Sequence, residues 1–154
     1  MSRAYVGLGA NIGNPQATIH RAVELLSQTQ QVTLVALSTL RETEPVGFVD
    51  QPRFLNGAAA IDTELSARAL LDRLLEIEQE LGRTRSGLAN GPRTIDLDLL
   101  LYDQVELKLP GLTLPHPRLH VRCFALEPLA ELDADLEIPG RGPIQLIMRR
   151  LHCG

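Results

Sequence analysis

The sequence is poor in aromatic residues and has no excess of positive charge. Tryptophan is absent, and phenylalanine and tyrosine supply only 3% of the 154 residues, so an aromatic side chain beside a loop is a notable candidate for ligand binding. The 15 lysines and arginines are outnumbered by 19 aspartates and glutamates, which gives a formal net charge of −4. Such a chain has no general attraction for nucleic acid or for an anionic membrane. We therefore expect neither as a partner, and an anionic ligand must be held by basic residues gathered at one site.

Cysteines and long apolar runs are also scarce. Cys123 and Cys153 lack the paired spacing of a zinc site and the density of a disulfide-rich scaffold, so we expect both to be reduced thiols. No run approaches the ~18 apolar residues of a membrane span, and the segment MSRAYVGLGAN has no secretory signal. The length suits one domain, residues 1–154, which we expect to find in the cytoplasm.

Hydrophobic periodicity and turn residues predict an alternation of strands and helices. Strands are expected at about 4–8, 32–41 and 54–62, helices at about 15–28 and 66–81, and a further strand in GPRTIDLDLLLYD, residues 91–103. Asn14 and Pro15 suit the start of the first helix, and Gly82 suits the end of the second. A helical turn, a short helix and a helix at 143–151 follow. The order β-α-β-β-α-β predicts an α+β fold, a ferredoxin-like sandwich with an antiparallel sheet and additional C-terminal helices.

The strand at residues 91–103 carries two carboxylates in an apolar run. Side chains two residues apart point to the same face of a strand, so Asp96 and Asp98 face one way. The residues expected on the other face are Ile95, Leu97, Leu99 and Leu101. Two ionised carboxylates ~7 Å apart repel by roughly 2 kcal/mol at an effective dielectric near 20. A compensating partner is therefore expected.

Two partners for the carboxylates remain open. In one alternative, Asp96 and Asp98 are solvated or form ion pairs with Arg83 and Arg93. In the other they bind a hard divalent cation, because carboxylate oxygens on a rigid face suit Mg²⁺. The loop RTRSGLANGP, which leads into the strand, favours the second alternative because its arginines can hold the phosphates of a magnesium-bound polyphosphate.

Other candidate residues each have a structural and a functional interpretation. The segment GLGANIGN can be a plain turn or a phosphate-binding loop, although it lacks the full pattern of either known glycine-rich motif. His116, between two prolines, belongs to a structural turn or contacts a nucleotide. Arg122 forms a salt bridge or binds phosphate, and Phe54 and Phe124 pack in the core or stack on a flat ligand.

Several motifs together resemble a known family. GPRTIDLDLLLY is similar to the signature of the 6-hydroxymethyl-7,8-dihydropterin pyrophosphokinases, enzymes of folate biosynthesis that transfer pyrophosphate from ATP to a pterin alcohol. AYVGLGANIGN, ETEPVGFVDQPRFLNGAA, EIEQELGRTR and LTLPHPRLHVRCFALEPLAEL resemble other segments of the same family, in the same order. The resemblance implies an ATP-dependent kinase-type transferase with small-molecule substrates, ATP and a reduced pterin, which we expect to act as a monomer.

The resemblance also implies roles for individual residues. The catalytic set comprises Arg83, Arg93, Asp96 and Asp98, with the two aspartates holding two Mg²⁺ ions. The ATP site comprises Glu78, Arg85, Thr113, His116 and Arg122. The pterin ring lies between Phe54 and Phe124, and its polar edge meets Thr43, Pro45, Val46 and Asn56. The chain departs from some members at Asn90, where they have a tryptophan, at Leu75, where they have a glutamine, and at Gly111, where they have a basic residue.

The expected chemistry is an in-line attack of the pterin hydroxymethyl oxygen on the β-phosphorus of ATP, with release of AMP. No side chain stands out as a general base, because positioning and charge neutralisation can account for most of a phosphoryl-type transfer. Two other functions remain open from the residues alone. A nucleotidyltransferase uses similar paired carboxylates but releases pyrophosphate, and a ferredoxin-like ligand-sensing module needs no Mg-ATP at all.

Overall fold

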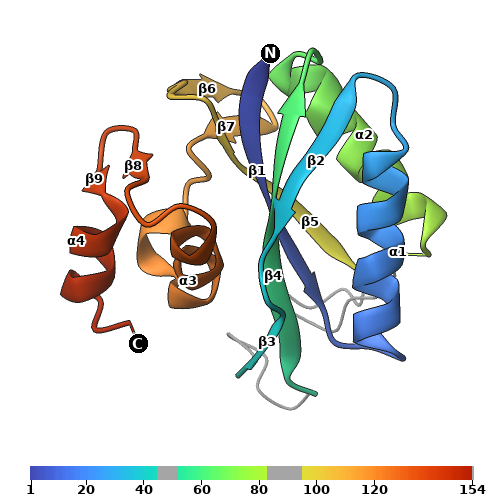
Figure 1. Ribbon diagram of the computed structural model, residues 1–154, viewed down its shortest axis with the longest axis horizontal. Helices are drawn as coiled ribbons and strands as arrows, with labels where there is room; N and C mark the ends of the chain where they lie inside the picture. Colours follow the sequence, from blue (N-terminus) through green and yellow to red (C-terminus); the bar gives the residue numbers. More distant parts are fainter. Residues whose placement is uncertain (45–51, 83–94, 154) are drawn as a thin grey trace.

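An antiparallel sheet separates two layers of helices in the computed structural model of the chain (Figure 1). The structure describes residues 1–44, 52–82 and 95–153. The main strands are β1 (Ser2–Ala10), β2 (Val32–Leu37), β4 (Phe54–Thr63) and β5 (Asp96–Tyr102), in the order β2-β4-β1-β5. A short strand, β3 (Arg41–Thr43), also pairs with β4. This order, with a helix after the first and third main strands, is the predicted ferredoxin-like arrangement.

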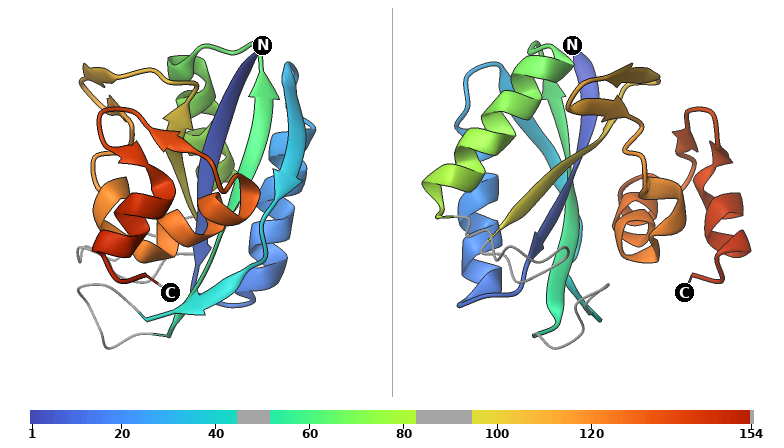
Figure 2. Two further views of the ribbon diagram at one scale, coloured as in Figure 1. Left: turned by 60° about the vertical axis from the view of Figure 1, so that its left-hand side comes forward. Right: turned by 180° about the vertical axis from the view of Figure 1, so that it is seen from behind.

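Each face of the sheet is covered by a different set of helices (Figure 2). Helices α1 (Pro15–Ser27) and α2 (Ala67–Glu80) cover one face, which we call the helix face. The single turn η1 (Leu119–Val121) and helices α3 (Cys123–Leu132) and α4 (Ile144–Arg150) lie on the opposite face, called the pocket face below. Two small hairpins complete the described chain. They are β6 (Leu107–Leu109) with β7 (Leu112–Leu114), and β8 (Glu137–Ile138) with β9 (Gly142–Pro143).

The first two helices begin where their capping residues predict. The Asn14 side chain accepts a hydrogen bond from the Ala17 N–H at 3.2 Å, and Pro15 occupies the first turn of α1. The Ser66 hydroxyl accepts from the Ala69 N–H at 3.1 Å at the start of α2. Gly82 follows this helix with a φ of 76°, in the left-handed region that glycine adopts without a steric penalty. These local signals were therefore sufficient to locate both helices.

The predicted strand at 32–41 is in fact two strands, β2 and β3, and the break begins at Ser38. The Ser38 hydroxyl accepts the Ala58 N–H at 2.9 Å, and the Ser38 N–H donates to the Ala58 carbonyl at 2.9 Å. A side chain has thus taken the place of a main-chain acceptor beside β4, which ends the regular ladder. The prediction of one continuous strand was wrong for this reason. The first strand differs in the other direction, since β1 continues to Ala10 and includes Gly9.

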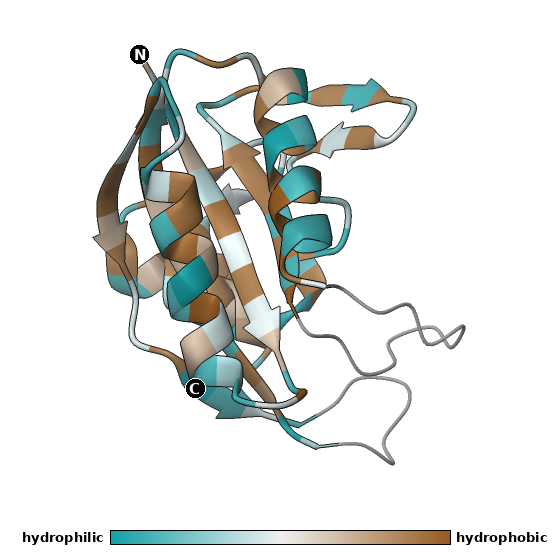
Figure 3. Cartoon of the chain, turned by 90° about the vertical axis from the view of Figure 1, so that its right-hand side faces the viewer, coloured by the Kyte–Doolittle hydropathy of each residue, from teal (hydrophilic) through white to brown (hydrophobic). Residues whose placement is uncertain are grey.

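The helix face carries the larger hydrophobic core. Val6 and Leu8 of β1, Ile61 of β4, and Leu74 and Ile77 of α2 are each at most 3% exposed. Figure 3 looks onto α1 and α2 from this side and shows apolar and polar residues alternating along them. Fully burying a large aliphatic side chain contributes about 1.5–3 kcal/mol, so this layer is the main source of the fold's stability.

A second, smaller core lies on the pocket face. Its sheet residues include Tyr5, Ala60 and Leu101, and its helix residues include Leu126 and Leu129. Leu101 was predicted to share a face with Leu99, and that prediction was wrong. Val6 pairs with Leu99 whereas Tyr5 pairs with Leu101, so Leu100 is an extra residue in β5. This β-bulge shifts the alternation by one and sends Leu101 to the pocket face.

The expectation of two reduced thiols is also wrong in this structure. Cys123, at the start of α3, forms a disulfide with Cys153, after the end of α4, across a sequence separation of 30 residues. Helices α3 and α4 lie side by side, which brings the two cysteines together although neither has a partner nearby in sequence (Figure 1).

No helix in the described part of the chain is long and apolar enough to cross a membrane.

Candidate active site

A cavity of about 380 Å³ opens on the pocket face, between the sheet and the segment that leads into α3. It brings together residues from β1, β3, β4, β5 and the segment 116–125. The lining residues that bear on its chemistry are Gly7, Gly9, Thr43, Phe54, Asn56, Asp96, Asp98, Leu100, His116, Arg118, Arg122 and Phe124. We call this cavity the main pocket.

The floor of the main pocket is formed by two carboxylates and two glycines on neighbouring strands. Asp96 pairs with Gly9 and Asp98 pairs with Gly7, so all four positions lie on the pocket face of the sheet. A Cβ added at Gly9 would lie 3.1 Å from the Asn56 Oδ1, and one at Gly7 would lie 3.2 Å from a Leu100 methyl carbon. The glycines therefore leave open the space beside the two carboxylates.

One wall comes from the end of the sheet at β3 and β4. Thr43 and Phe54 are paired there, and the side-chain amide of Asn56 donates to the Thr43 hydroxyl. Asn56 is only 7% exposed, so its amide is held in one orientation at the edge of the cavity. A fixed amide beside an aromatic ring suits a flat ligand with a polar edge, because the ring meets the face of the ligand and the amide reads its edge.

The opposite wall begins at His116, which is fixed on both sides. The main-chain N–H of His116 donates to the Leu100 carbonyl at 2.9 Å, and the ring Nδ1 accepts the main-chain N–H of Arg118 at 3.2 Å. Burial and then the positive charge of Arg122 lower the pKa of His116, with a smaller lowering from Arg118, while Asp96 acts in the opposite direction. The imidazole is therefore neutral at pH 7 with its proton on Nε2, and it can donate one hydrogen bond to a ligand.

Arg122 and Phe124 complete this wall at the start of α3. The Arg122 guanidinium carbon lies 5.4 Å from the centroid of the Phe124 ring, a cation–π distance. This contact joins a cationic group to an aromatic surface at the edge of the main pocket. A ligand with both a flat ring and an anionic group meets complementary groups here.

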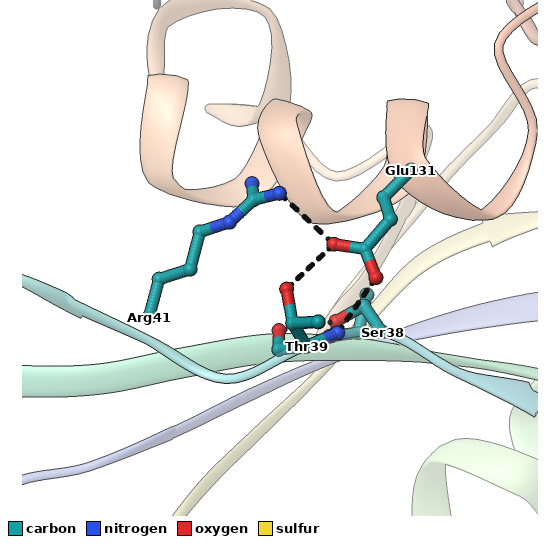
Figure 4. A network of polar contacts seen from close by, with 5 residues as sticks. Ser38, Thr39, Arg41 and Glu131 are labelled. Atoms are coloured by element: carbon teal, nitrogen blue, oxygen red, sulfur yellow. Dashed lines mark hydrogen bonds and ion pairs between the residues drawn. The ribbon is translucent and has the colours of Figure 1, made fainter.

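Helix α3, which carries Phe124, is fastened to the sheet by Glu131 (Figure 4). One Glu131 carboxylate oxygen accepts the Thr39 N–H at 2.7 Å, and the other accepts the Thr39 hydroxyl at 2.7 Å and an Arg41 guanidinium N–H at 2.9 Å. The two hydrogen bonds from Thr39, with a smaller contribution from the charge of Arg41, lower the pKa of Glu131. The distal end of α3 is thereby fixed while its first turn borders the cavity.

The remaining predicted site residues are distributed between other places. Thr113 lines a second depression, which shares His116, Pro117 and Leu119 with the main pocket. Glu78 is 2% exposed and accepts the Leu97 N–H at 2.7 Å, so it joins α2 to β5 on the helix face. Five predicted residues lie outside the residues that the structure describes. They are Arg83, Arg85, Arg93, Pro45 and Val46.

The pocket residues that the sequence patterns missed include Gly7, Gly9 and Arg118. The segment that contains both glycines was considered as a turn or a phosphate loop, and only Gly7 fell in the predicted strand, whereas both lie within β1 opposite the aspartates. Their position follows from strand register, which the sequence alone did not supply. Arg118 had one usable signal, its place four residues before Arg122 in the segment PHPRLHVR.

The carboxylates of the floor fit a hard divalent cation. Asp96 and Asp98 are partly exposed on one face of a rigid strand, and the glycines beside them leave room for a ligand. Magnesium prefers oxygen ligands and usually keeps one or two protein carboxylates together with substrate phosphates and waters. The residues present therefore suit such an ion in the main pocket.

Comparisons relate the chain to known proteins. The sequence profile of the 7,8-dihydro-6-hydroxymethylpterin-pyrophosphokinase family matches residues 5–134. A 2-amino-4-hydroxy-6-hydroxymethyldihydropteridine pyrophosphokinase from Pseudomonas aeruginosa is 46% identical over 139 residues, which cover 90% of this chain and 85% of the relative. The enzyme of the same name from Bacillus subtilis is 46% identical over 134 residues, which cover 87% of this chain and 80% of the relative.

Solved structures show the same fold. Wild-type Plasmodium falciparum HPPK-DHPS with pteroate matches 97% of this chain with a TM-score of 0.75 at 13% identity. The match covers 42% of that solved chain, so this chain spans less than half of its length. The family profile covers most of this chain, and two relatives exceed 40% identity over most of their own length. The chain belongs to the 7,8-dihydro-6-hydroxymethylpterin-pyrophosphokinase family.

Proposed function

We propose that the chain transfers pyrophosphate from ATP to the hydroxymethyl group of 6-hydroxymethyl-7,8-dihydropterin, giving AMP and the pterin diphosphate. It is an ATP-dependent pyrophosphokinase of folate biosynthesis. Family membership supports the reaction, and one structural observation supports its location in the main pocket. The two aspartates lie beside two glycines on a floor that faces both aromatic and cationic walls.

In this proposal the pterin lies between Phe54 and Phe124. The polar edge of the ring meets Thr43, Asn56, Pro45 and Val46, of which the first two line the main pocket. Supporting this assignment, the Asn56 amide is buried and oriented by its hydrogen bond to Thr43. A buried amide that binds a substrate selects strongly against analogues that leave it without a partner.

Asp96 and Asp98 hold two Mg²⁺ ions in this proposal. When bound, the ions neutralise charge on the triphosphate and help to position its phosphates. Arg83 and Arg93 contact the transferred phosphates and, with the aspartates, form the catalytic set. A rigid strand suits the aspartates because their spacing does not change as the charge moves during transfer.

Arg85, Thr113, His116 and Arg122 supply the remaining ATP contacts, while Glu78, which the resemblance also assigns to the ATP site, acts through β5 without contacting the nucleotide. The continuity of the second depression with the main pocket at His116 supports one ligand that spans both. Neutral His116 donates from Nε2 to that ligand. The buried position of Glu78 against the Leu97 backbone makes it a positioning residue for β5 in this proposal.

The chain's own residues account for the reaction without a general base. The aromatic walls orient the pterin so that its hydroxymethyl oxygen is in line with the β-phosphorus of ATP, and Arg83 and Arg93 hold the phosphates that are transferred. As the new bond to the β-phosphorus forms, the bond from that phosphorus to the bridging oxygen of AMP breaks, and the alcohol proton passes to a phosphate oxygen. Exclusion of water from the pocket prevents its competition with the alcohol.

Further parts of the proposal concern the state of the protein. We infer one domain across residues 1–154 that acts as a monomer in the cytoplasm, with ATP and a reduced pterin as its partners and no nucleic acid. The net charge of −4 supports the last point.

Product identity tests the proposed reaction. The protein is incubated with MgATP and the reduced pterin, and nucleotides and pterins are separated by chromatography. We expect AMP in a one-to-one ratio with pterin diphosphate. Formation of ADP, or release of pyrophosphate with an adenylylated pterin, would contradict the assignment, and the second result would indicate a nucleotidyltransferase.

A further inference from the structure

Arg118 lines the main pocket but has no assigned role. It lies at the start of η1 and is exposed. Within the described residues, its guanidinium forms no ion pair, side-chain hydrogen bond or ring contact. It is thus a cationic group at a cavity whose floor carries two carboxylates.

Several other arginines differ from Arg118 because their guanidinium groups form contacts within the fold. Arg3 pairs with Asp62 at 2.6 Å, Arg41 pairs with Glu131 at 2.9 Å, and the Arg122 guanidinium lies over the Phe124 ring. These contacts serve the packing of the sheet and of α3. Because the Arg118 side chain forms no such contact, its substitution should change the free energy of unfolding only slightly.

The backbone of Arg118 is nevertheless well fixed. Its N–H donates to the His116 Nδ1 at 3.2 Å, and its carbonyl accepts the Val121 N–H at 3.2 Å. Leu119, the next residue, is 1% exposed and anchors this segment in the second core. The main chain at Arg118 is therefore held on a rigid segment, while the guanidinium group remains available to bind a ligand.

The position of Arg118 selects one part of the ligand. Arg118 lines the main pocket, with the aspartates and both phenylalanines, and does not line the second depression that contains Thr113. In the proposed reaction, the group that enters the main pocket on ATP and leaves it on the pterin is the transferred diphosphate. Its oxygens match the planar fork of a guanidinium better than the point charge of a lysine.

We propose that Arg118 binds the transferred diphosphate, both on ATP and on the pterin product. This inference rests on the proposed function and adds a binding residue to it. Arg118 offsets negative charge that the floor carboxylates bring to the same cavity, and it does so from a segment that also orients His116. Its contribution is to affinity for phosphate-bearing ligands rather than for the pterin ring.

Three variants and four ligands test the assignment. Arg118→Ala removes the cation, Arg118→Lys keeps the charge without the fork, and Arg149→Ala is the matched control, an exposed arginine of α4 that lines neither cavity. Calorimetry in Mg²⁺ gives the Kd of inorganic pyrophosphate, pterin diphosphate and 6-hydroxymethylpterin, and steady-state kinetics gives KM for ATP. Thermal unfolding of each variant reports on the fold.

We expect Arg118→Ala to weaken pyrophosphate and pterin diphosphate by about 10- to 100-fold, the effect of a hydrogen bond to a charged group. KM for ATP rises by a similar factor, Arg118→Lys is intermediate, and the affinity for the phosphate-free pterin is unchanged. The assignment is overturned if Arg118→Ala matches Arg149→Ala for pyrophosphate, or if the phosphate-free pterin weakens equally. If the wild-type protein forms no AMP, the proposed function itself fails, whereas AMP formation with unaffected Arg118 variants rejects this inference alone.

Discussion

The two faces of the sheet are made by the same strands and serve different purposes. On β1, Val6 and Leu8 point to the helix face while Gly7 and Gly9 point to the pocket face. On the helix face, large aliphatic residues extend along the strands and pack against α1 and α2. The pocket face is packed at one end by the second core and is open at the other.

This difference shows how a small sheet can carry a polar site without losing its stability. Because side chains alternate, the glycine and aspartate positions of β1 and β5 on the pocket face have apolar neighbours on the helix face. Asp96 and Asp98 are flanked by Ile95, Leu97 and Leu99, each at most 4% exposed. Substitutions on the pocket face should therefore change activity, and substitutions on the helix face should change stability.

The largest expected effect is on turnover, from Asp98→Ala. We expect kcat to fall by about 10³-fold or more, because a carboxylate that holds positive charge at the reacting phosphates is lost. The free energy of unfolding should change by less than about 1 kcal/mol, since Asp98 is only partly buried. Asp72→Ala, at an exposed position on α2, is the control for kcat. Intact turnover in Asp98→Ala would exclude the metal role.

The next effect concerns the cross-link within the pocket-face layer. Cys153→Ser removes a disulfide that closes a loop of 30 residues, and we expect the free energy of unfolding to fall by about 3.5 kcal/mol. Chemical denaturation with and without dithiothreitol measures this change. Reductant should destabilise the wild type by a similar amount and leave the variant unaffected. Equal stability of both proteins in the absence of reductant would show that the cross-link does not form.

Leu74→Ala tests, from the helix face, whether stability and activity depend on different faces of the sheet. Leu74 is fully buried, and its truncation should lower the free energy of unfolding by about 3 kcal/mol through lost burial and a residual cavity. KM and kcat should stay within about twofold of wild type at temperatures well below unfolding. Its neighbour Leu75, 42% exposed, provides the control, and Leu75→Ala should cost less than about 1 kcal/mol. A changed KM in Leu74→Ala would contradict the separation of the two faces.

Gly9→Ala tests the pocket face by adding one methyl group to the floor of the main pocket. The new Cβ would lie 3.1 Å from the Asn56 Oδ1, a contact that displaces the amide proposed to read the pterin edge. We expect KM for the pterin to rise by about tenfold, in line with about 1–3 kcal/mol for overpacking. Steady-state kinetics measures this KM, and thermal unfolding reports whether the variant keeps its fold. An unaltered KM for the pterin in Gly9→Ala would contradict the proposed contact between Asn56 and the pterin.

The smallest effect is expected at Glu131 and depends on pH. Its folded-state pKa lies below the ordinary value of 4.5, so its ionised form stabilises the fold above that value, and the stabilisation is lost as pH falls through the folded pKa. Glu131→Gln should cost about 1 kcal/mol at pH 7, a magnitude typical of a partly exposed ion pair. Denaturation at several pH values should show the difference between the two proteins shrinking below about pH 4. A constant difference would mean that charge plays no part.

The sequence predicted those features that depend on local chemistry. Asn14 and Ser66 located the helix starts, and the alternation around Asp96 and Asp98 correctly separated the carboxylates from Leu97 and Leu99. The features it missed depend on contacts distant in sequence. The disulfide follows from the packing of α4 on α3, the role of Gly7 and Gly9 follows from the register between β1 and β5, and the turn of Leu101 to the other face follows from a bulge.

The site shows the same limit. Thr43, Phe54, Asn56, His116, Arg122 and Phe124 were nominated from motifs, and the fold gathers all of them around the main pocket. Glu78 came from the same resemblance but lies on the other face, where its carboxylate accepts the Leu97 N–H of β5, and it does not line the cavity. Arg118 needed the fold, since only the path of η1 brings it to the same cavity as Asp98.

The most direct test of the two-face account is an NMR titration of the methyl and aromatic side chains. The protein is titrated with Mg²⁺, a non-hydrolysable ATP analogue and the reduced pterin, and the signals of Leu100 and Phe124 on the pocket face are compared with those of Leu74 and Ile61 on the helix face. We predict large shift changes at Leu100 and Phe124 and small ones at Leu74 and Ile61. Larger changes at Leu74 and Ile61 would contradict the account.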